Sequence, residues 1–131
     1  MKVRASKEGL AVQATVDAVY PKDTIVAISG DRTVTKALAA GAAIGRLTVP
    51  ATAAGGLGTV ELHARFSSFI EILAATAVPT AGNRVKLGAP DGTTGENTVS
   101  AFIEGTDSER LAVGVVWKGA VMGAVAEVLA Y

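Results

Sequence analysis

Apolar and polar residues alternate along much of the chain with a period of two. In residues 10–20 one row of alternate positions is apolar or small, while the other row carries Gln13, Thr15 and Asp17. Successive side chains of a strand point to opposite faces of a sheet, so this pattern predicts a half-buried strand. Pro21 and the polar residues after it end the pattern.

The same pattern recurs in short segments that are separated by turn residues. The closing segment, residues 120–131, is compatible with a helical stripe, but its valines favour a strand. Glycine-rich or turn-rich loops are predicted at residues 52–58 and 89–97. The other predicted strands are residues 24–29, 33–37, 41–51, 60–66, 69–74, 84–87, 99–105 and 111–117.

About eight to ten short strands at this spacing are typical of an all-β barrel or sandwich. One short helix is compatible with residues 36–43 or with residues 67–78. The sequence shows no internal repeat, no heptad pattern and no linker. We therefore expect residues 10–131 to form a single small β-barrel domain, preceded by a flexible arm over residues 1–9.

Composition narrows the classes of partner. The 131 residues suit one domain, and 12 basic residues balance 12 acidic ones. A neutral chain lacks the basic surface that binds nucleic acid or an anionic membrane. The longest uncharged run, residues 47–60, is too short for a bilayer, which takes about 20 apolar residues. The start has no sustained apolar core, so we expect no signal peptide.

The segment "VELHARF" (residues 60–66) holds the only histidine, His63, between Glu61 and Arg65. On a strand, side chains two residues apart lie about 6–7 Å from each other. That separation does not allow the hydrogen bond that a general base and its orienting carboxylate need. We therefore interpret the three residues as a polar strand face that meets solvent or a second subunit. An enzyme centred on Glu61 and His63, and a pH-sensitive contact through His63, stay open as alternatives.

Other motifs for cofactors or catalysis are incomplete. With no cysteine and one histidine, only a carboxylate metal site is possible, and "PDGTTGEN" lacks the calcium-loop spacing. The "GGLG" stretch lacks the G-K-[ST] ending of a phosphate loop and leads into a strand. No serine lies in a G-x-S-x-G turn. These gaps predict no cofactor, no metal and no catalytic residue, and favour a structural or binding role.

Four stretches in order resemble the small β-barrel decoration, or cement, proteins of tailed-bacteriophage heads. They are "GDRTVTKA", "GAAIGRLTVPA", "GTVELHARFSSFIEILAATAVPTAGNRVKLG" and "LAVGVVWKGAVMGAVAEVLAY", and they cover most of residues 20–131. In that family a hydrophobic strand is followed by a small-residue segment ending "aGd.V", which "TAGNRVKLG" matches apart from its asparagine. The "APDGTTGEN" loop is a further departure from the family pattern.

The resemblance implies a role outside catalysis. Such proteins bind the outer surface of the assembled shell at symmetry axes, often as trimers, and brace it against packaged DNA. It therefore implies the major capsid protein and further copies of this chain as partners. It also implies a location on the outer capsid surface of the virion, after synthesis in the host cytoplasm. The alternative is a small bacterial β-barrel that binds or carries a ligand, with the glycine-rich loop as its lid.

The contact residues are hypotheses at this stage. A basic N-terminal arm is able to add a strand to the edge of a partner's sheet. Large aromatic side chains concentrate binding energy at interfaces, although Trp117 also suits a core. We expect Lys2, Val3, Arg4 and Lys7 to bind the capsid, and Glu61, His63, Arg65, Trp117 and Tyr131 to contact a second subunit.

Overall fold

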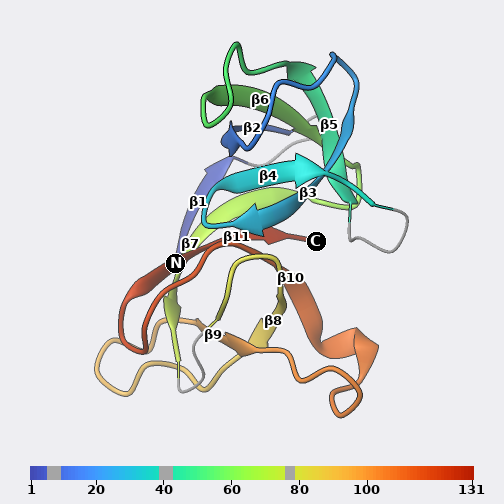
Figure 1. Cartoon of the computed structure of the whole chain (residues 1–131). Coiled ribbons are helices and arrows are strands. Elements are labelled where there is room, and N and C mark those ends of the chain that lie inside the picture. The colour runs from blue at the N-terminus through green and yellow to red at the C-terminus, as the bar shows by residue number, and fades with distance from the viewer. Residues whose placement is uncertain (6–9, 39–42, 76–78) are drawn as a thin grey trace.

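The computed structural model describes residues 1–5, 10–38, 43–75 and 79–131. Within these ranges the chain is all-β apart from one 3-10 turn, η1 (Glu109–Leu111), which confirms the predicted class (Figure 1). The strands are β1 (Lys2–Ala5), β2 (Ala11–Val16), β3 (Ile25–Gly30), β4 (Thr33–Lys36), β5 (Ala43–Val49), β6 (Leu57–Leu62), β7 (Ser68–Ala74), β8 (Arg84–Leu87), β9 (Thr98–Ala101), β10 (Ala112–Lys118) and β11 (Val125–Ala130).

Five strands close a first barrel in the order β2-β4-β3-β5-β6. All neighbouring strands are antiparallel except β2 and β4, which are parallel and pair only at Thr15 and Val16. The interior is filled by fully buried aliphatic side chains, as is usual for a barrel this narrow. They include Val16, Val26, Val34, Leu47 and Val60.

The other six strands form a sheet in the order β1-β7-β11-β10-β8-β9, and an additional pairing of β7 with β9 closes five of them into a ring. The β7–β9 pairing is again parallel and again involves only two residues, Leu73 and Ala74. The strand β1 lies outside this ring, on the edge of β7. A second barrel therefore follows the first, and its interior is filled by Ile72, Val85, Val99, Val116 and Val128.

The two barrels repeat one topology, with β2 to β6 corresponding in order to β7 to β11. Their registers also agree: Val12 pairs with Val60 in the first barrel, and Ile70 pairs with Val128 at the equivalent place in the second. The single barrel expected over residues 10–131 is thus a tandem of two. Further equivalent pairs are Val26–Gly45 with Val85–Gly114, and Leu47–Val60 with Val116–Val128.

Two glycines mark the same tight crossing in both barrels. A Cβ added at Gly45 would lie 2.1 Å from the backbone oxygen of Glu61, and one added at Gly114 would lie 2.5 Å from that of Leu129. No side chain fits so close to a neighbouring strand, which is why both positions are glycine. The register of β5 shifts next to Gly45 on the β3 edge, and again between Leu47 and Val49 on the β6 edge.

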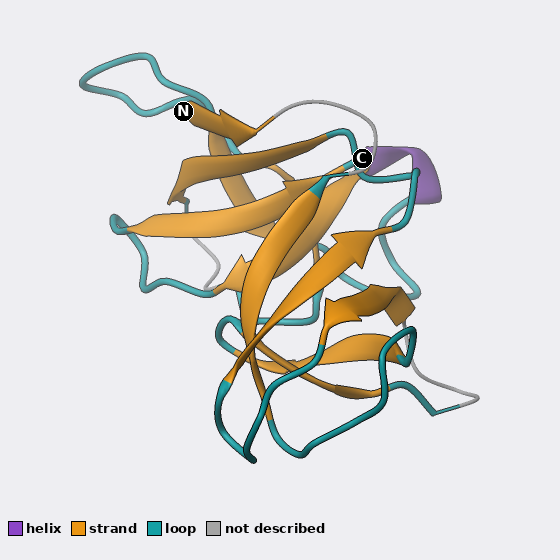
Figure 2. Ribbon diagram, turned by 90° about the horizontal axis from the view of Figure 1, so that it is seen from above, coloured by secondary structure: helices purple, strands orange, loops and turns teal. Residues whose placement is uncertain are grey.

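The barrels are joined by a shared core. Figure 2 shows how the strands of the two barrels are arranged when seen from above. Val115, Trp117 and Leu129 of the second barrel belong to the same buried cluster as the interior of the first. Polar contacts support this junction, since the Arg32 N–H donates to the Trp117 carbonyl at 2.9 Å. The Arg32 guanidinium also pairs with the buried carboxylate of Glu127, with Nε 2.9 Å from Oε1.

The corresponding wall of the first barrel faces outward and is polar. The equivalents of Val115 and Leu129 are Arg46 and Glu61, whose side chains are roughly half exposed and lie 3.6 Å apart, from Nη2 to Oε2. The same wall is therefore apolar where a barrel covers it and charged where none does, which is the usual consequence of burial.

The one short helix that the sequence allowed, at residues 36–43 or 67–78, is not found in the described residues. Residues 68–74 form β7, so the helix considered over residues 67–78 is wrong there, because Ile70, Ile72 and Ala74 alternate inward with strand period. Of residues 36–43, the first belongs to β4 and the last to β5. Residues 39–42 and 76–78 lie outside the described residues.

Candidate interface residues

The expected N-terminal arm is partly a strand. Lys2, Val3 and Arg4 lie in β1, where Lys2 pairs with Glu71 and Val3 with Ile70. On one edge of β7, β9 pairs only with the last two residues, and β1 pairs with the remaining backbone groups. A free arm is therefore wrong for residues 2–5. Lys7 lies outside the described residues. A capsid contact through the side chain of Lys2, which is exposed, stays a prediction.

The polar row predicted from "VELHARF" does not exist as a row. The strand β6 ends at Leu62, and the chain then turns, with the Phe66 N–H donating to the His63 carbonyl at 3.1 Å. The turn is required because the chain leaves the first barrel here and enters the second. Ala64 is exposed, whereas Phe66 is buried.

Glu61, His63 and Arg65 consequently face different neighbours. Glu61 lies near Arg46 on the outer wall of the first barrel. The exposed His63 is fixed through its backbone N–H, which donates to Ile44. The Arg65 guanidinium donates to the Ala43 carbonyl at 2.8 Å. The structure therefore does not assemble an acid–base pair from these residues.

Arg65 and Tyr131 meet instead at the ring of Phe66. The Arg65 guanidinium lies 4.9 Å from the centre of this ring, and the Tyr131 ring stacks on it with centroids 5.7 Å apart. Tyr131 is 41% exposed and remains available for a subunit contact. Trp117 is only 2% exposed, so it anchors the junction of the two barrels and not a surface.

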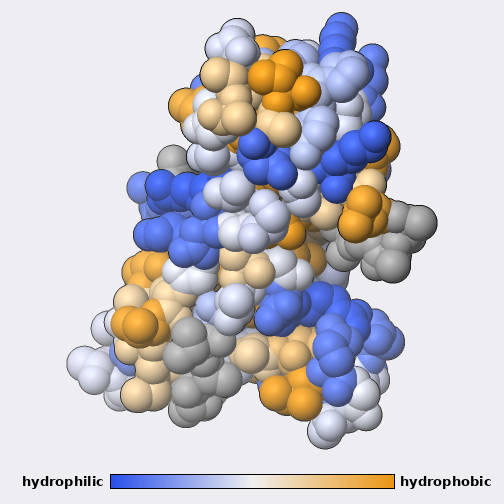
Figure 3. Space-filling view, in the orientation of Figure 1, coloured by the Kyte–Doolittle hydropathy of each residue, from blue (hydrophilic) through white to orange (hydrophobic). Residues whose placement is uncertain are grey.

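An apolar surface that we did not predict lies on the β10–β11 hairpin. Val121, Met122 and Val125 are 68%, 63% and 53% exposed, and we call them the hairpin patch. In Figure 3 apolar atoms gather at the lower left, over this hairpin. The run "AVMGAV" was the available signal, but hydropathy does not say which of its residues are exposed. The equivalent hairpin of the first barrel exposes Val49 and Leu57.

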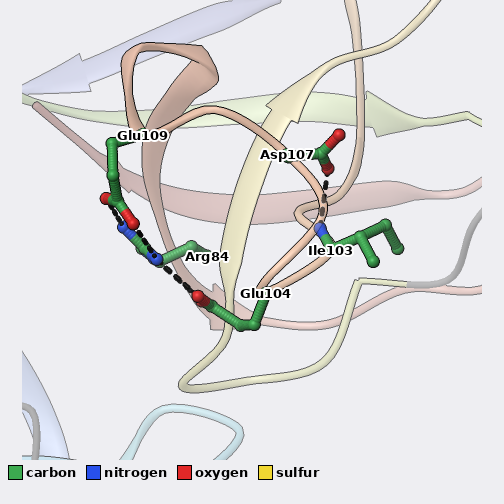
Figure 4. A network of polar contacts seen from close by, with 5 residues as sticks. All are labelled: Arg84, Ile103, Glu104, Asp107 and Glu109. Atoms are coloured by element: carbon green, nitrogen blue, oxygen red, sulfur yellow. Dashed lines mark hydrogen bonds and ion pairs between the residues drawn. The ribbon is translucent and has the colours of Figure 1, made fainter.

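A cluster of charges around Arg84 holds a loop in place. Arg84 of β8 donates from Nε to Glu104 at 2.9 Å and from Nη2 to Glu109 at 3.0 Å (Figure 4). The guanidinium holds the pKa of each carboxyl below its ordinary value, mainly through these hydrogen bonds. It also lies 4.3 Å from the centre of the Phe102 ring.

Asp107 fixes the same loop from within. Its carboxylate accepts from the Lys86 ammonium at 2.9 Å and from the Ile103 N–H at 2.7 Å, and these contacts lower its pKa. Figure 4 shows the contact with Ile103. The strand β8 thus clamps residues 102–111 through Arg84 and Lys86. These shifted groups are surface ion pairs, whose role is structural.

The turn-rich loop is closed by its own side chain. The Asp91 carboxylate accepts from the backbone N–H of Thr94 at 2.8 Å and of Thr93 at 3.2 Å, which lowers its pKa. The carboxylate therefore serves a turn, as the sequence predicted. Across residues 1–5, 10–38, 43–75 and 79–131, no group of three or more potential ligands is placed to hold a metal ion.

A cleft of about 500 Å³ lies between the two barrels. Strand β2 of the first barrel forms one side, and Phe69, Trp117 and Glu127 of the second form the other. The full lining of the cleft is Ala11, Val12, Gln13, Thr15, Arg32, Leu57, Phe69, Trp117 and Glu127.

Within the described ranges no helix has the length and apolar character needed to cross a membrane.

No protein-family model matches the chain, and no curated protein matches it. Among solved structures, the chain is similar to the N base of the head fiber protein gp8.5 of bacteriophage phi29. The two are 18% identical, the alignment covers 93% of each chain, and the TM-score is 0.36. A similarity at this level supports no conclusion about function.

Proposed function

We propose that the chain is a structural protein of a tailed-bacteriophage head that binds the outer surface of the assembled capsid and stabilises it against internal DNA pressure. It acts as a homotrimer at symmetry axes, with the major capsid protein as its partner and without catalysis. The observation that carries the proposal is the hairpin patch: Val121 and Met122 in the turn after β10, and Val125 at the start of β11, are large apolar side chains exposed on one hairpin. Exposed apolar groups of this kind mark protein–protein contacts.

The sequence resemblance supports this reading, because its segments coincide with the framework of both barrels. Residues 30–37 contain β4, and residues 41–51 contain β5. Residues 58–88 include most of β6 and all of β7 and β8, while residues 111–131 contain β10 and β11. The resemblance therefore extends over the strands that build the fold, and the hairpin patch lies within its last segment.

The alternative function, a barrel that carries a ligand, is disfavoured because both barrel interiors are filled by side chains. Their interiors are occupied by valine, leucine and isoleucine side chains with almost no exposed surface. A carrier barrel needs an interior wide enough to hold its ligand. The open surfaces of the described residues lie outside the barrels, which suits a protein that binds a large partner.

The physical mechanism is mass action on assembly. A protein that binds only the assembled shell shifts the equilibrium toward that shell. Full burial of an aliphatic or Met side chain contributes about 1.5–3 kcal/mol, against which the cost of association must be set. A trimer presents three patches at once, and multivalent attachment raises the net affinity without any new kind of contact.

The test mixes the purified chain with empty shells assembled from the major capsid protein encoded in the same genome. We expect the chain to sediment with the shells, to appear as outer-surface density at repeating positions, and to raise the melting temperature of the shells. Met122→Glu should weaken binding at least about tenfold, since it would bury a charge. The matched control is Leu38→Glu, whose side chain is 78% exposed but lies in the first barrel.

A chain that stays in the supernatant at all concentrations contradicts the proposal. Light scattering on a sizing column tests the trimer separately, because a monomer in solution and on the shell contradicts that part alone. Equal loss of binding in Met122→Glu and Leu38→Glu refutes the hairpin patch as the contact.

A further inference from the structure

The repeat of the two barrels reveals an unmatched sheet edge. In the second barrel the edge of β7 that faces away from β11 takes two strands, β9 at Leu73 and Ala74 and β1 at residues 69–71. In the first barrel the equivalent edge of β2 takes β4 at Thr15 and Val16. No strand in the described residues pairs with this edge at residues 11–13.

Hydrogen bonds along β2 show which backbone groups point to that edge. The Val16 N–H donates to the Gly56 carbonyl at 2.9 Å, on the side of β6, while the Thr15 N–H donates to the Arg32 carbonyl at 2.9 Å, on the other side. Backbone groups alternate in direction along a strand. The N–H and C=O groups of Ala11 and Gln13 therefore point to the edge that β4 does not reach.

This edge opens into space. Ala11, Gln13 and Thr15 line the cleft of about 500 Å³ between the barrels, opposite Phe69 and Trp117. The edge is thus neither packed against the second barrel nor covered by a described loop. The walls of the cleft combine the apolar Leu57, Phe69 and Trp117 with the paired charges of Arg32 and Glu127. An unpaired strand edge that opens into such a cleft is a template for an additional strand.

We propose that residues 11–13 of β2 are a strand-acceptor site, where an extended segment of a partner pairs with the first barrel as β1 pairs with the second. The identity of the partner rests on the proposed function: it is an extended segment of the capsid subunit. Main-chain hydrogen bonds would supply the affinity, and alternate side chains would supply the specificity.

The strand β1, which pairs with β7 of the second barrel, indicates which residues an occupant of the acceptor site should carry. Val3 lies opposite Ile70, and Ala5 lies opposite Phe69. The equivalents of Ile70 and Phe69 are Val12 and Ala11. The acceptor site therefore suits a segment that has an apolar β-branched residue followed two positions later by a small one.

A second copy of the chain fits the site less well. The described residues contain one strand of this kind, β1, for two equivalent edges, and β1 already occupies the edge of its own β7. A copy that lent its β1 to a neighbour would uncover its own β7. We therefore assign the strand that pairs with the first barrel to a different protein and not to the β1 of a second copy.

A synthetic peptide that copies residues 1–6 tests the site without any capsid. We expect amide hydrogen exchange, followed by NMR, to slow at Ala11 and Gln13 when the peptide is added, with Phe69 and Glu71 unchanged. Gln13→Pro removes the N–H that points to the open edge, and proline is tolerated on an edge in that orientation. It should weaken peptide binding about tenfold or more, through a lost hydrogen bond and the ring's bulk.

Gln13→Thr is the matched control, because it changes the side chain and keeps the N–H. If Gln13→Pro fails to fold, Ala11→Pro replaces it, since the first residue of a strand accepts proline. Unchanged exchange at Ala11 and Gln13 with saturating peptide overturns the acceptor site. Equal peptide affinity of the folded proline variant and the Thr variant overturns it as well.

The shell assay separates this inference from the proposed function. If the wild type decorates shells and the folded proline variant decorates them equally, the capsid segment is not the occupant and the proposed function stands. If the wild type does not decorate shells, the proposed function fails, while the peptide result still decides the acceptor site. Self-association of the wild type that Gln13→Pro abolishes would assign the site to a second copy and overturn the capsid segment.

Discussion

Alanine at Gly45 or Gly114 tests whether the two barrels share one strand crossing. The added Cβ would lie 2.1 Å from the Glu61 oxygen in the first barrel and 2.5 Å from the Leu129 oxygen in the second, whereas ordinary contacts begin at 3.4 Å. Both oxygens belong to a paired backbone, so relief requires a neighbouring strand to move by roughly 1 Å. Overpacking costs about 1–3 kcal/mol, and disturbed strand pairing adds about 1 kcal/mol.

We therefore expect each variant to lose about 2–4 kcal/mol of unfolding free energy, measured by urea denaturation with far-ultraviolet circular dichroism. The control is Gly30→Ala in β3, where the nearest atom to the new Cβ is 3.8 Å away. It should gain about 0.4–1 kcal/mol, because alanine restricts the unfolded chain. A loss below about 1 kcal/mol at Gly45 or Gly114, or an equal loss at Gly30, would refute the reasoning.

Three further predictions concern the junction, a turn and the ion pairs. Trp117→Ala should reduce the free energy of unfolding by about 3–5 kcal/mol and lower the temperature of a single unfolding transition that both barrels share. Two separate transitions by calorimetry would contradict a shared core. Gly82→Ala should cost about 1 kcal/mol in urea because φ is +88° there, and Gly82→Asn should cost less; equal losses would contradict a conformational cause. Arg84 lowers the pKa of Glu104 and Glu109 in the folded protein. Their contribution to the free energy of unfolding is therefore complete above 4.5, their pKa in the unfolded chain, and is lost as the pH falls below it. The urea midpoint of Arg84→Gln should therefore fall less steeply on acidification than that of the wild type, and parallel curves would show that these pairs add nothing.

Much of the strand content could be read from the sequence, because each strand carries its own alternation. Arg84–Leu87 was predicted with the observed bounds, and the inward row of β2 is buried as expected. The repeat of the two barrels could not be predicted from the sequence. Equivalent positions share their strand pairing but not their residue types. Trp117 and its equivalent Thr48 occupy one position in two barrels, yet one wall is covered and the other is not.

The candidate site was less predictable for related reasons. Spacing by two suggested that Glu61, His63 and Arg65 share a face, but the strand ends after Leu62, where the chain must pass between barrels. The N-terminal residues looked like an arm because their partner β7 lies far along the sequence. The hairpin patch was missed because hydropathy alone does not separate an exposed valine from a buried one.

Strand β7 has consequences for the order in which the nascent chain folds. One edge is paired by β1, which is synthesised well before β7, and the other by β11, which is synthesised well after it. All strands of the first barrel leave the ribosome before Ser68–Ala74, so that barrel is free to close during translation. The second barrel must wait for Val125–Ala130. Until β7 emerges, β1 has no native partner, and the growing chain carries its N-terminal strand beside an already complete barrel whose own edge is still open.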